Sequence, residues 1–176
     1  MFIMVQKSSQ EKVFNIFVEE PSKIHYVKEI SKKINLAPTS VKNHLIRLEK
    51  QNLIHKEKGE RFNGFIANRD NEGFLFYKKI ANIKNLRESK LLQFLVESIY
   101  PDSIILYGSY LRGEDVESSD IDFIIFTKKG KKLNVKKFEK ILKRRVHIMI
   151  EKSLDSLPNE LKKEVINGST LYGYLK

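Results

Sequence analysis

The 176-residue sequence predicts an α+β fold in two parts, and the spacing of its apolar residues is the main reason. Before residue 52, apolar residues recur every three or four positions, which is the spacing of helices that bury one face. A basic stretch around Gly59-Glu60 then has the pattern of a β-hairpin. After residue 100, short apolar runs of strand length alternate with helical stretches, as in an α+β or α/β domain.

The first predicted domain covers residues 1–70 and contains three helices followed by the hairpin. Pro21 ends the first helical pattern, and Thr39 stands where an N-cap of the third helix is expected. The segments assigned to these elements are Ser9 to Glu20, His25 to Ile34, Ser40 to Gln51, Leu53 to Lys58 and Arg61 to Asn68.

Residues 71–87 are expected to form a polar connector that holds one helix, and residues 88–176 form the second predicted domain. Its predicted order is helix, strand, strand, helix, strand, helix, with a short tail after Gly168. The segments are Glu88 to Ile99, Ser103 to Tyr107, Ile121 to Thr127, Val135 to Lys143, Val146 to Ile150 and Leu157 to Ile166.

Positive charge is concentrated in two blocks of a chain whose net charge is +11. Between Lys23 and Arg69 there are eleven Lys or Arg against four Glu, and between Lys128 and Arg145 there are ten against one. Two such blocks indicate contacts with polyanions, either nucleic acid or nucleotide phosphates, although a lysine-rich solvated surface would have the same composition.

The third helix has one apolar face that can anchor it and one polar, basic face that can enter a DNA groove. We expect Val41, Leu45 and Leu48 to be buried and His44 to be a half-buried packing residue. The segment TSVKNHLIRLEKQNLI resembles the recognition-helix stretch of winged-helix transcription regulators, over roughly residues 8–69. That resemblance implies double-stranded DNA as a partner, contacted by Ser40, Lys42, Asn43 and Arg47 on the helix and by Lys56, Lys58 and Arg61 on the hairpin. The alternative is a winged helix for protein interaction or dimerisation, and a homodimer would suit paired DNA half-sites.

The stretch from Leu106 to Phe126 combines a small-residue turn with two carboxylates. Gly108 and Ser109 end a strand, where a backbone can approach a phosphate and a hydroxyl can bind it. Asp120 and Asp122 are two residues apart at the start of the next strand, so both carboxylates are expected on one face. Paired carboxylates attract a hard dication, and Mg²⁺ binds few carboxylates together with substrate phosphates.

This stretch resembles the DNA polymerase β-like nucleotidyltransferases, and most closely the minimal nucleotidyltransferases that are paired with toxins. The shared residues are Gly108-Ser109, Arg112-Gly113 and Ser119-Asp120-Ile121-Asp122. The resemblance covers about Glu88 to Lys176 and implies a small mixed sheet and the transfer of a nucleoside monophosphate, AMP from ATP, to a protein or other hydroxyl. It implies Mg²⁺ (or Mn²⁺) at Asp120 and Asp122, and triphosphate binding by Gly108, Ser109 and Arg112.

One position departs from the family pattern, which has a third carboxylate on the following strand. His147 stands there, and imidazole is a poorer partner for Mg²⁺ than a carboxylate. Glu151, four residues further on, could substitute if the strand continues. Glu114, Asp115 and Glu117 are expected to form a solvated acidic loop rather than further metal ligands.

These residues leave two further classes of function open. If the missing carboxylate inactivates the site, the chain is a transcription regulator that senses a nucleotide, or an antitoxin that binds a partner toxin. The longest apolar runs are too short for a membrane span. No cysteine is present, which excludes disulfides and fits a reducing compartment, with the cytoplasm expected.

Overall fold

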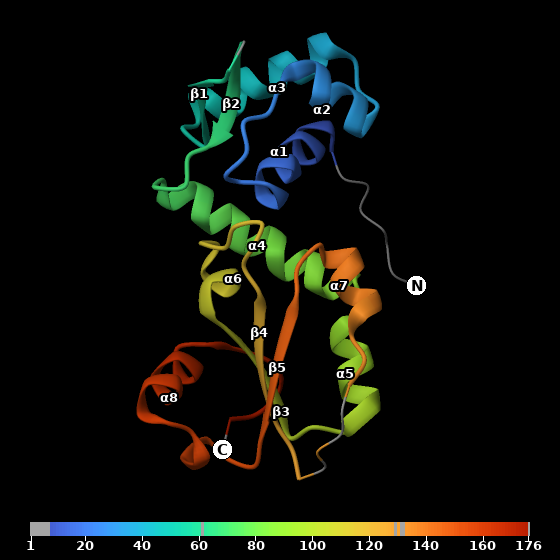
Figure 1. Cartoon of the computed structure of the whole chain (residues 1–176), viewed down its shortest axis with the longest axis vertical. Coiled ribbons are helices and arrows are strands. Elements are labelled where there is room, and N and C mark those ends of the chain that lie inside the picture. Colours follow the sequence, from blue (N-terminus) through green and yellow to red (C-terminus); the bar gives the residue numbers. More distant parts are fainter. Residues whose placement is uncertain (1–7, 61, 129, 131–132, 176) are drawn as a thin grey trace. The chain divides into compact units, whose positions relative to one another are not determined.

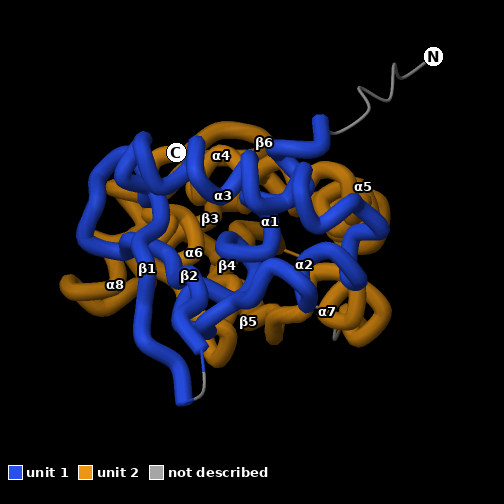
Figure 2. The backbone as a smooth tube through the Cα atoms, turned by 90° about the horizontal axis from the view of Figure 1, so that it is seen from above, with its two compact units in different colours: residues 1–75 blue, residues 76–176 orange. Residues whose placement is uncertain are grey.

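The computed structural model describes residues 8–60, 62–128, 130 and 133–175. The chain divides into two compact units, residues 1–75 and 76–176 (Figure 2). Helix α4 (Glu72–Glu88) begins in the first unit and continues in the second, so the predicted connector is occupied by one continuous helix. None of the described helices has the length and apolar composition needed to cross a membrane.

Three helices and a two-stranded antiparallel hairpin form the first unit, in the predicted order. They are α1 (Ser9–Glu19), α2 (Val27–Ile34), α3 (Pro38–Lys50), β1 (Ile54–Lys58) and β2 (Asn63–Ala67). The side chains at its centre are apolar and come from every element of the unit, because each helix presents one apolar stripe. They include Val13, Phe17, Ile30, Val41, Leu45, Leu48, Ile54 and Phe74.

The start of α3 differs from the prediction. The helix begins at Pro38, its N-cap is Ala37, and no side chain caps it. Proline at the first helical position needs no hydrogen-bond partner for its nitrogen and already has a helical φ, so it starts the helix before Thr39 is reached. The prediction of Thr39 as N-cap was therefore wrong. In contrast, Ser8 caps α1, with its hydroxyl accepting from the N–H of Glu11 at 3.1 Å.

The second unit is a four-stranded mixed sheet with helices on both faces (Figure 1). The strand order is β5-β4-β3-β6, with β4 and β5 parallel and the other pairs antiparallel. The elements after α4 are α5 (Leu91–Ile99), β3 (Ser103–Tyr107), α6 (Gly108–Arg112), β4 (Ile121–Phe126), α7 (Lys136–Leu142), β5 (Val146–Glu151), a 3₁₀ turn (Leu154–Ser156), α8 (Asn159–Ile166) and β6 (Ser169–Gly173).

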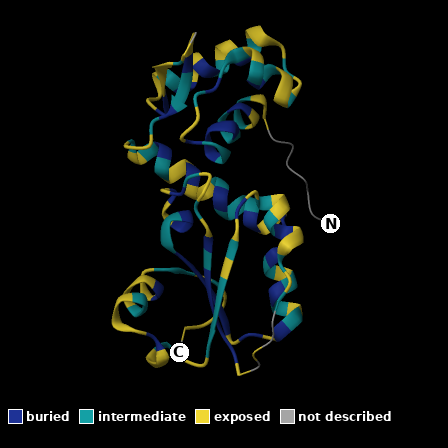
Figure 3. Ribbon diagram, viewed as in Figure 1, coloured by how far each residue is buried: buried dark blue, intermediate teal, exposed yellow. Residues whose placement is uncertain are grey.

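The central strands β3 and β4 are covered on both faces, which explains why their sequences are apolar apart from Ser103 and Asp122 (Figure 3). On one face, Ile104, Leu106, Phe123 and Ile125 pack with residues of α5 and α7. On the other face, Ile105, Ile124 and Phe126 pack with residues of the α8 region such as Leu157 and Val165. This second face is also the face of β4 to which Asp122 belongs, since side chains alternate along a strand.

The C-terminal tail was the largest omission among the predicted elements. Residues 169–173 form strand β6, which pairs with β3 in antiparallel fashion and completes the sheet on that side. Gly173 makes this pairing possible, because a Cβ there would lie 1.9 Å from the carbonyl oxygen of Asp102. Only a glycine allows the two backbones to approach so closely.

Candidate active site

The chain reverses direction directly after β3, and this reversal brings Gly108 beside Asp122. Tyr107 and Asp122 are paired residues of the antiparallel strands β3 and β4. Gly108 has φ +77°, and a Cβ there would lie 2.9 Å from Oδ2 of Asp122. Ser109 is the next residue of α6 and is half-buried. The structure therefore brings together the glycine of the small-residue turn and one of the two sequence-predicted carboxylates.

His147 lies beside the same carboxylate. Asp122 and His147 are register partners in the parallel pair β4–β5, and Nδ1 of His147 is 3.3 Å from Oδ1 of Asp122. The side chain of Asp122 is 27% exposed and that of His147 is 55% exposed, so both are open to a ligand. The two oxygens of Asp122 thus face different neighbours, Gly108 on one side and an imidazole on the other.

Asp120 and Glu151, the other two acidic candidates, have different surroundings. Asp120 is exposed and lies directly before β4, where it lines a cavity with residues of α7. Glu151 pairs with Phe126, four residues further along the strands than His147, which is about 13 Å at the rise of a β-strand. Its carboxylate accepts a hydrogen bond from the hydroxyl of Ser156 at 2.9 Å. The structure does not bring Glu151 to Asp122, and no three His, Asp or Glu residues form a metal-binding group within the described ranges.

Arg112 is held by two carboxylates in the protein. Its Nε donates to Glu114 at 2.7 Å and its Nη1 donates to Glu164 of α8 at 3.0 Å. The hydrogen bond to Glu114 is the main reason why the pKa of Arg112 is raised, with Glu164 adding to it. Because the side chain of Arg112 is 48% exposed, a phosphate can approach it and would compete with these two partners.

Tyr107 contributes a neutral phenol next to the Asp122 pair. The side chain is buried, and burial raises the pKa of its hydroxyl; the negative charges of Asp122 and Glu164 raise it further. Sequence reasoning assigned this residue only to a strand. Its role in the surroundings of Asp122 depends on the β3–β4 register, which the sequence does not specify.

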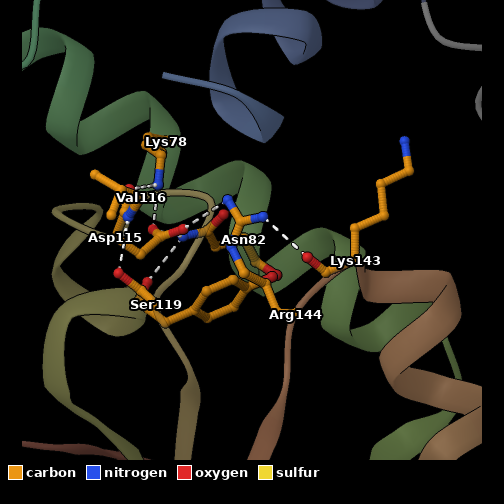
Figure 4. Close-up of polar contacts among 8 residues, drawn as sticks. Lys78, Asn82, Asp115, Val116, Ser119, Lys143 and Arg144 are labelled. Atoms are coloured by element: carbon orange, nitrogen blue, oxygen red, sulfur yellow. Dashed lines mark hydrogen bonds and ion pairs between the residues drawn. The ribbon is translucent and has the colours of Figure 1, made fainter. Parts of the chain in front are cut away.

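Asp115 contradicts the prediction of a solvated acidic loop. Glu114 and Glu117 are exposed, but Asp115 is 1% exposed. Its carboxylate binds Nζ of Lys78, accepts from Asn82 at 2.8 Å and faces Arg144 at 3.4 Å (Figure 4). A carboxylate between two buried cations is far better stabilised than an isolated one, so this loop residue can be buried.

The same contacts fix the loop that leads to Asp120. Nζ of Lys78 also donates to the carbonyl of Asp115 at 2.8 Å, and the hydroxyl of Ser119 accepts from the N–H of Val116 at 2.9 Å. Asn82 further donates to the carbonyl of Tyr110 at 2.9 Å. Lys78 and Asn82 were not singled out from the sequence, because nothing local distinguishes them from other polar residues of α4, and their partners are 28 to 37 residues away.

The helix α3 of the first unit has the two faces that its sequence predicts. Val41, Leu45 and Leu48 are buried, His44 and Ser40 are half-buried, and Lys42, Asn43 and Arg47 are exposed. On the hairpin, Lys56 and Lys58 are exposed, and Nζ of Lys56 lies 3.2 Å from Oε1 of Glu49. Arg61 lies outside the described residues.

Comparison with known proteins bears on the second unit alone. Neither the curated proteins nor the solved structures gave a match. A family model matches residues 88–171, a segment that contains Gly108, Asp122 and His147 and leaves out residues 1–87. The family of this model is described as a nucleotidyltransferase domain.

Proposed function

We propose that the chain transfers a nucleoside monophosphate, AMP from ATP, to a hydroxyl of a protein or another acceptor. The observation that carries this proposal is the approach of Gly108 to the carboxylate of Asp122, within a segment that matches a nucleotidyltransferase domain. A glycine backbone next to a carboxylate allows a triphosphate and its cation to lie within reach of one another. Ser109, which follows on α6, supplies a hydroxyl for the same phosphates.

The reaction is a displacement at the α-phosphorus. The acceptor oxygen forms a bond to the α-phosphorus, the bond from that phosphorus to the bridging oxygen breaks, and pyrophosphate leaves with that oxygen. The hydroxyl proton passes to solvent. Arg112, which already binds anionic partners, neutralises part of the phosphate charge when the triphosphate replaces Glu114 or Glu164.

The donors at this site fit a hard divalent cation bound together with the nucleotide. Asp120 and Asp122 offer carboxylate oxygens, and Mg²⁺ takes few protein carboxylates and completes its shell with phosphate oxygens and water. His147 is an additional donor, although imidazole suits Mg²⁺ and Mn²⁺ less well than a carboxylate does. A cation at these residues would offset the charge of the phosphates and of the leaving pyrophosphate.

For the first unit we propose binding to double-stranded DNA through a winged helix. The exposed cations of α3 support this proposal, and so does the hairpin. Its strand β2 is joined to the segment before α2 by a β-bridge between His25 and Phe65, with backbone hydrogen bonds of 2.8 and 2.9 Å. In this proposal Ser40, Lys42, Asn43 and Arg47 face the groove, with Lys56, Lys58 and Arg61 near the phosphates, and a homodimer reads two half-sites. Substituting Lys42 and Arg47 by Gln should weaken DNA binding at least tenfold and reduce its salt dependence.

The transfer reaction is tested with ATP labelled at the α-phosphate in the presence of Mg²⁺. Label should reach the protein itself or an added acceptor, and Asp122→Asn should abolish it. Asp102→Asn removes an exposed carboxylate at the opposite end of β3 and serves as the matched control. Equal labelling by the wild type and Asp122→Asn would exclude this site as the source of the activity.

A second function is favoured by the imidazole next to Asp122 and by the two carboxylates that hold Arg112. In this alternative the site binds a nucleotide without turnover, and the chain acts as a transcription regulator or as an antitoxin with a toxin partner. Calorimetry would then show ATP binding with no labelled product, and DNA affinity would change with ATP.

A further inference from the structure

The carboxylate of Asp120, one of the two proposed metal ligands, is not held by contacts of its own. The residue is exposed and lies directly before β4, whereas Asp122 lies within that strand between two paired neighbours. No other residue of the described ranges forms a hydrogen bond or an ion pair with the Asp120 side chain. A carboxylate binds a cation well only if it already stands near its place, because ordering it on binding costs free energy. The position of Asp120 therefore depends on its backbone.

A β-turn stands directly before Asp120, and Ser119 closes it in two ways (Figure 4). The N–H of Ser119 donates to the carbonyl of Val116 at 3.0 Å, and the N–H of Val116 donates to the hydroxyl of Ser119 at 2.9 Å. Both backbone polar groups of Val116 are thus bound by one residue, while Glu117 and Ser118 are exposed at the tip of the turn. The hydroxyl adds a second closure to the usual backbone one, so it makes the turn stiffer.

The residue before this turn anchors it in the protein interior. Asp115 is buried, and its carboxylate binds Nζ of Lys78 and accepts from Asn82 at 2.8 Å. Its carbonyl also accepts from Nζ of Lys78, at 2.8 Å. Lys78 and Asn82 are four residues apart on α4, so one regular helix holds both partners in place. The loop is bound through a carboxylate and through its backbone, and it cannot shift here without breaking a buried ion pair.

The residue after Asp120 is fixed as well, by the segment that leads into β5. The N–H of Ile121 donates to the carbonyl of Arg145 at 2.9 Å, and the guanidinium of Arg144 faces Asp115 at 3.4 Å. Asp120 therefore lies between two points that are both tied to the start of β5. Ile121 is held through backbone atoms, whereas the turn on the other side is closed in part by a side chain that can be substituted.

We propose that Ser119 is a positioning residue of the active site, which holds Asp120 in the place where its carboxylate binds the cation. The inference rests on the proposed function and concerns the residue that prepares one of its ligands. Removal of the hydroxyl leaves the N–H of Val116 without its acceptor and the turn with a single closure, so Asp120 spends less time in the binding position. Residues that orient a metal ligand without touching the metal usually contribute about 10- to 100-fold to metal affinity.

Three variants of the full-length chain separate this role from a general effect of substitution. Ser119→Ala removes the hydroxyl, and Ser119→Thr keeps it. Ser118→Ala is the matched control at the neighbouring exposed position, since the Ser118 hydroxyl forms no hydrogen bond within the described part of the chain. Mg²⁺ binding is measured by calorimetry in the presence of a non-hydrolysable ATP analogue, so that the readout is affinity and not turnover.

We expect Ser119→Ala to bind Mg²⁺ about tenfold more weakly than the wild type, and Ser119→Thr and Ser118→Ala to bind it as the wild type does. In the metal-free proteins, the amide of Val116 should exchange its hydrogen faster in Ser119→Ala alone. A merely structural role would lower the urea midpoint and leave the Mg²⁺ affinity of the folded protein unchanged. Equal Mg²⁺ affinity in Ser119→Ala and the wild type, or equal weakening in Ser118→Ala, would overturn the inference.

Transfer from ATP labelled at the α-phosphate distinguishes failure of this inference from failure of the proposed function. If the wild type and Ser119→Ala transfer label equally well at limiting Mg²⁺, the reaction stands and the positioning role is refuted. A loss of transfer in Ser119→Ala that excess Mg²⁺ restores supports both, because a higher cation concentration compensates for weaker binding. A wild type that binds no Mg²⁺ and transfers no label would refute the proposed function and this inference together.

Discussion

The carboxylate of Asp122 occupies the space in which a side chain of residue 108 would have to lie. Oδ2 is 2.9 Å from the position that a Cβ on Gly108 would take, and the backbone there has φ +77°. Two requirements therefore select glycine at this position. One is the left-handed backbone conformation, and the other is the contact with a carboxylate that we propose as a metal ligand.

Gly108→Ala should impair transfer much more than stability. The left-handed conformation costs about 1–2 kcal/mol for a residue with a Cβ, and the methyl group must push Asp122 aside. A displacement of about 1 Å in a reacting group can lower the rate about 100-fold. We expect a loss of that size in labelling with α-labelled ATP. Gly130→Ala is the control, because a Cβ there meets no atom within 4 Å. Wild-type activity in Gly108→Ala would show that this contact does not matter for the reaction.

Asp115→Asn should strongly destabilise the second unit. The substitution removes the carboxylate between two buried cations, Lys78 and Arg144, and breaking a buried pair costs about 3–5 kcal/mol. Lys78→Met should cost less, because the carboxylate then still faces one cation. The free energy of unfolding in urea, followed by circular dichroism, measures both.

The exposed pair of Lys162 and Asp155 provides the control for this ranking, since its carboxylate is at the surface. Asp155→Asn should leave the urea midpoint almost unchanged. If Lys78→Met destabilised the protein more than Asp115→Asn, the carboxylate would not be the centre of the cluster.

His147→Asp should tighten Mg²⁺ binding in the presence of a non-hydrolysable ATP analogue. The new carboxylate would stand next to Asp122, from which the imidazole Nδ1 is now 3.3 Å away, and Mg²⁺ prefers oxygen ligands. We expect about tenfold tighter binding of Mg²⁺ by calorimetry, and a gain for Mn²⁺ as well, since carboxylate and water ligands suit both ions. His55→Asp, at an exposed position of β1, should change neither. If His147→Asp and the wild type bound Mg²⁺ with equal affinity, the cation would have to lie away from β5.

Much of the fold could be predicted from the sequence, because local periodicity reflects which face of each element is buried. The apolar runs at Ser103–Tyr107 and Ile121–Phe126 predicted the two central strands, which are covered on both faces. Strand β6 was not predicted, since it is an edge strand with a mostly exposed sequence, and its pairing with β3 depends on tertiary contacts. Thr39 is not the N-cap of α3, because Pro38 already has a helical φ, needs no partner for its nitrogen, and starts the helix one residue earlier.

The candidate site was only partly predictable, since spacing along the chain does not determine register. Alternation along β4 places Asp122 on one face, but the neighbours of its carboxylate follow from the β3–β4 and β4–β5 registers. These registers bring Gly108 and His147 next to Asp122, and they place Glu151 four residues further along β5 than His147. The burial of Asp115 was not predictable, because its partner Lys78 lies on a helix 37 residues earlier.

The first unit should lose stability below about pH 6.5 because of His25. This side chain is fully buried against the ring of Phe17, and its Nε2 donates to the carbonyl of Glu20 at 2.9 Å. Burial lowers its pKa below the ordinary value of 6.5, although that backbone hydrogen bond and the charges of Glu20 and Glu29 oppose the shift. Above pH 6.5 the imidazole is neutral in both states. Below pH 6.5, the unfolded chain binds a proton on His25 that the folded protein does not bind. The free energy of unfolding therefore falls until the pH reaches the pKa of His25 in the folded state.

For one proton, the free energy of unfolding falls by at most about 1.4 kcal/mol per pH unit. The loss is followed between pH 7.5 and 5 through the urea midpoint at which the amide signals of α1 disappear from NMR spectra. Glu20 and Glu29 do not interfere, because hydrogen bonds from Lys33 and Lys23 lower the pKa of each below 4.5 and their stabilisation is lost only at lower pH. His25→Gln cannot titrate and should flatten the profile, whereas His55→Gln, at an exposed position, should retain the slope. A wild-type midpoint that stays constant across this range would show that the folded protein accepts the proton on His25 as readily as the unfolded chain does.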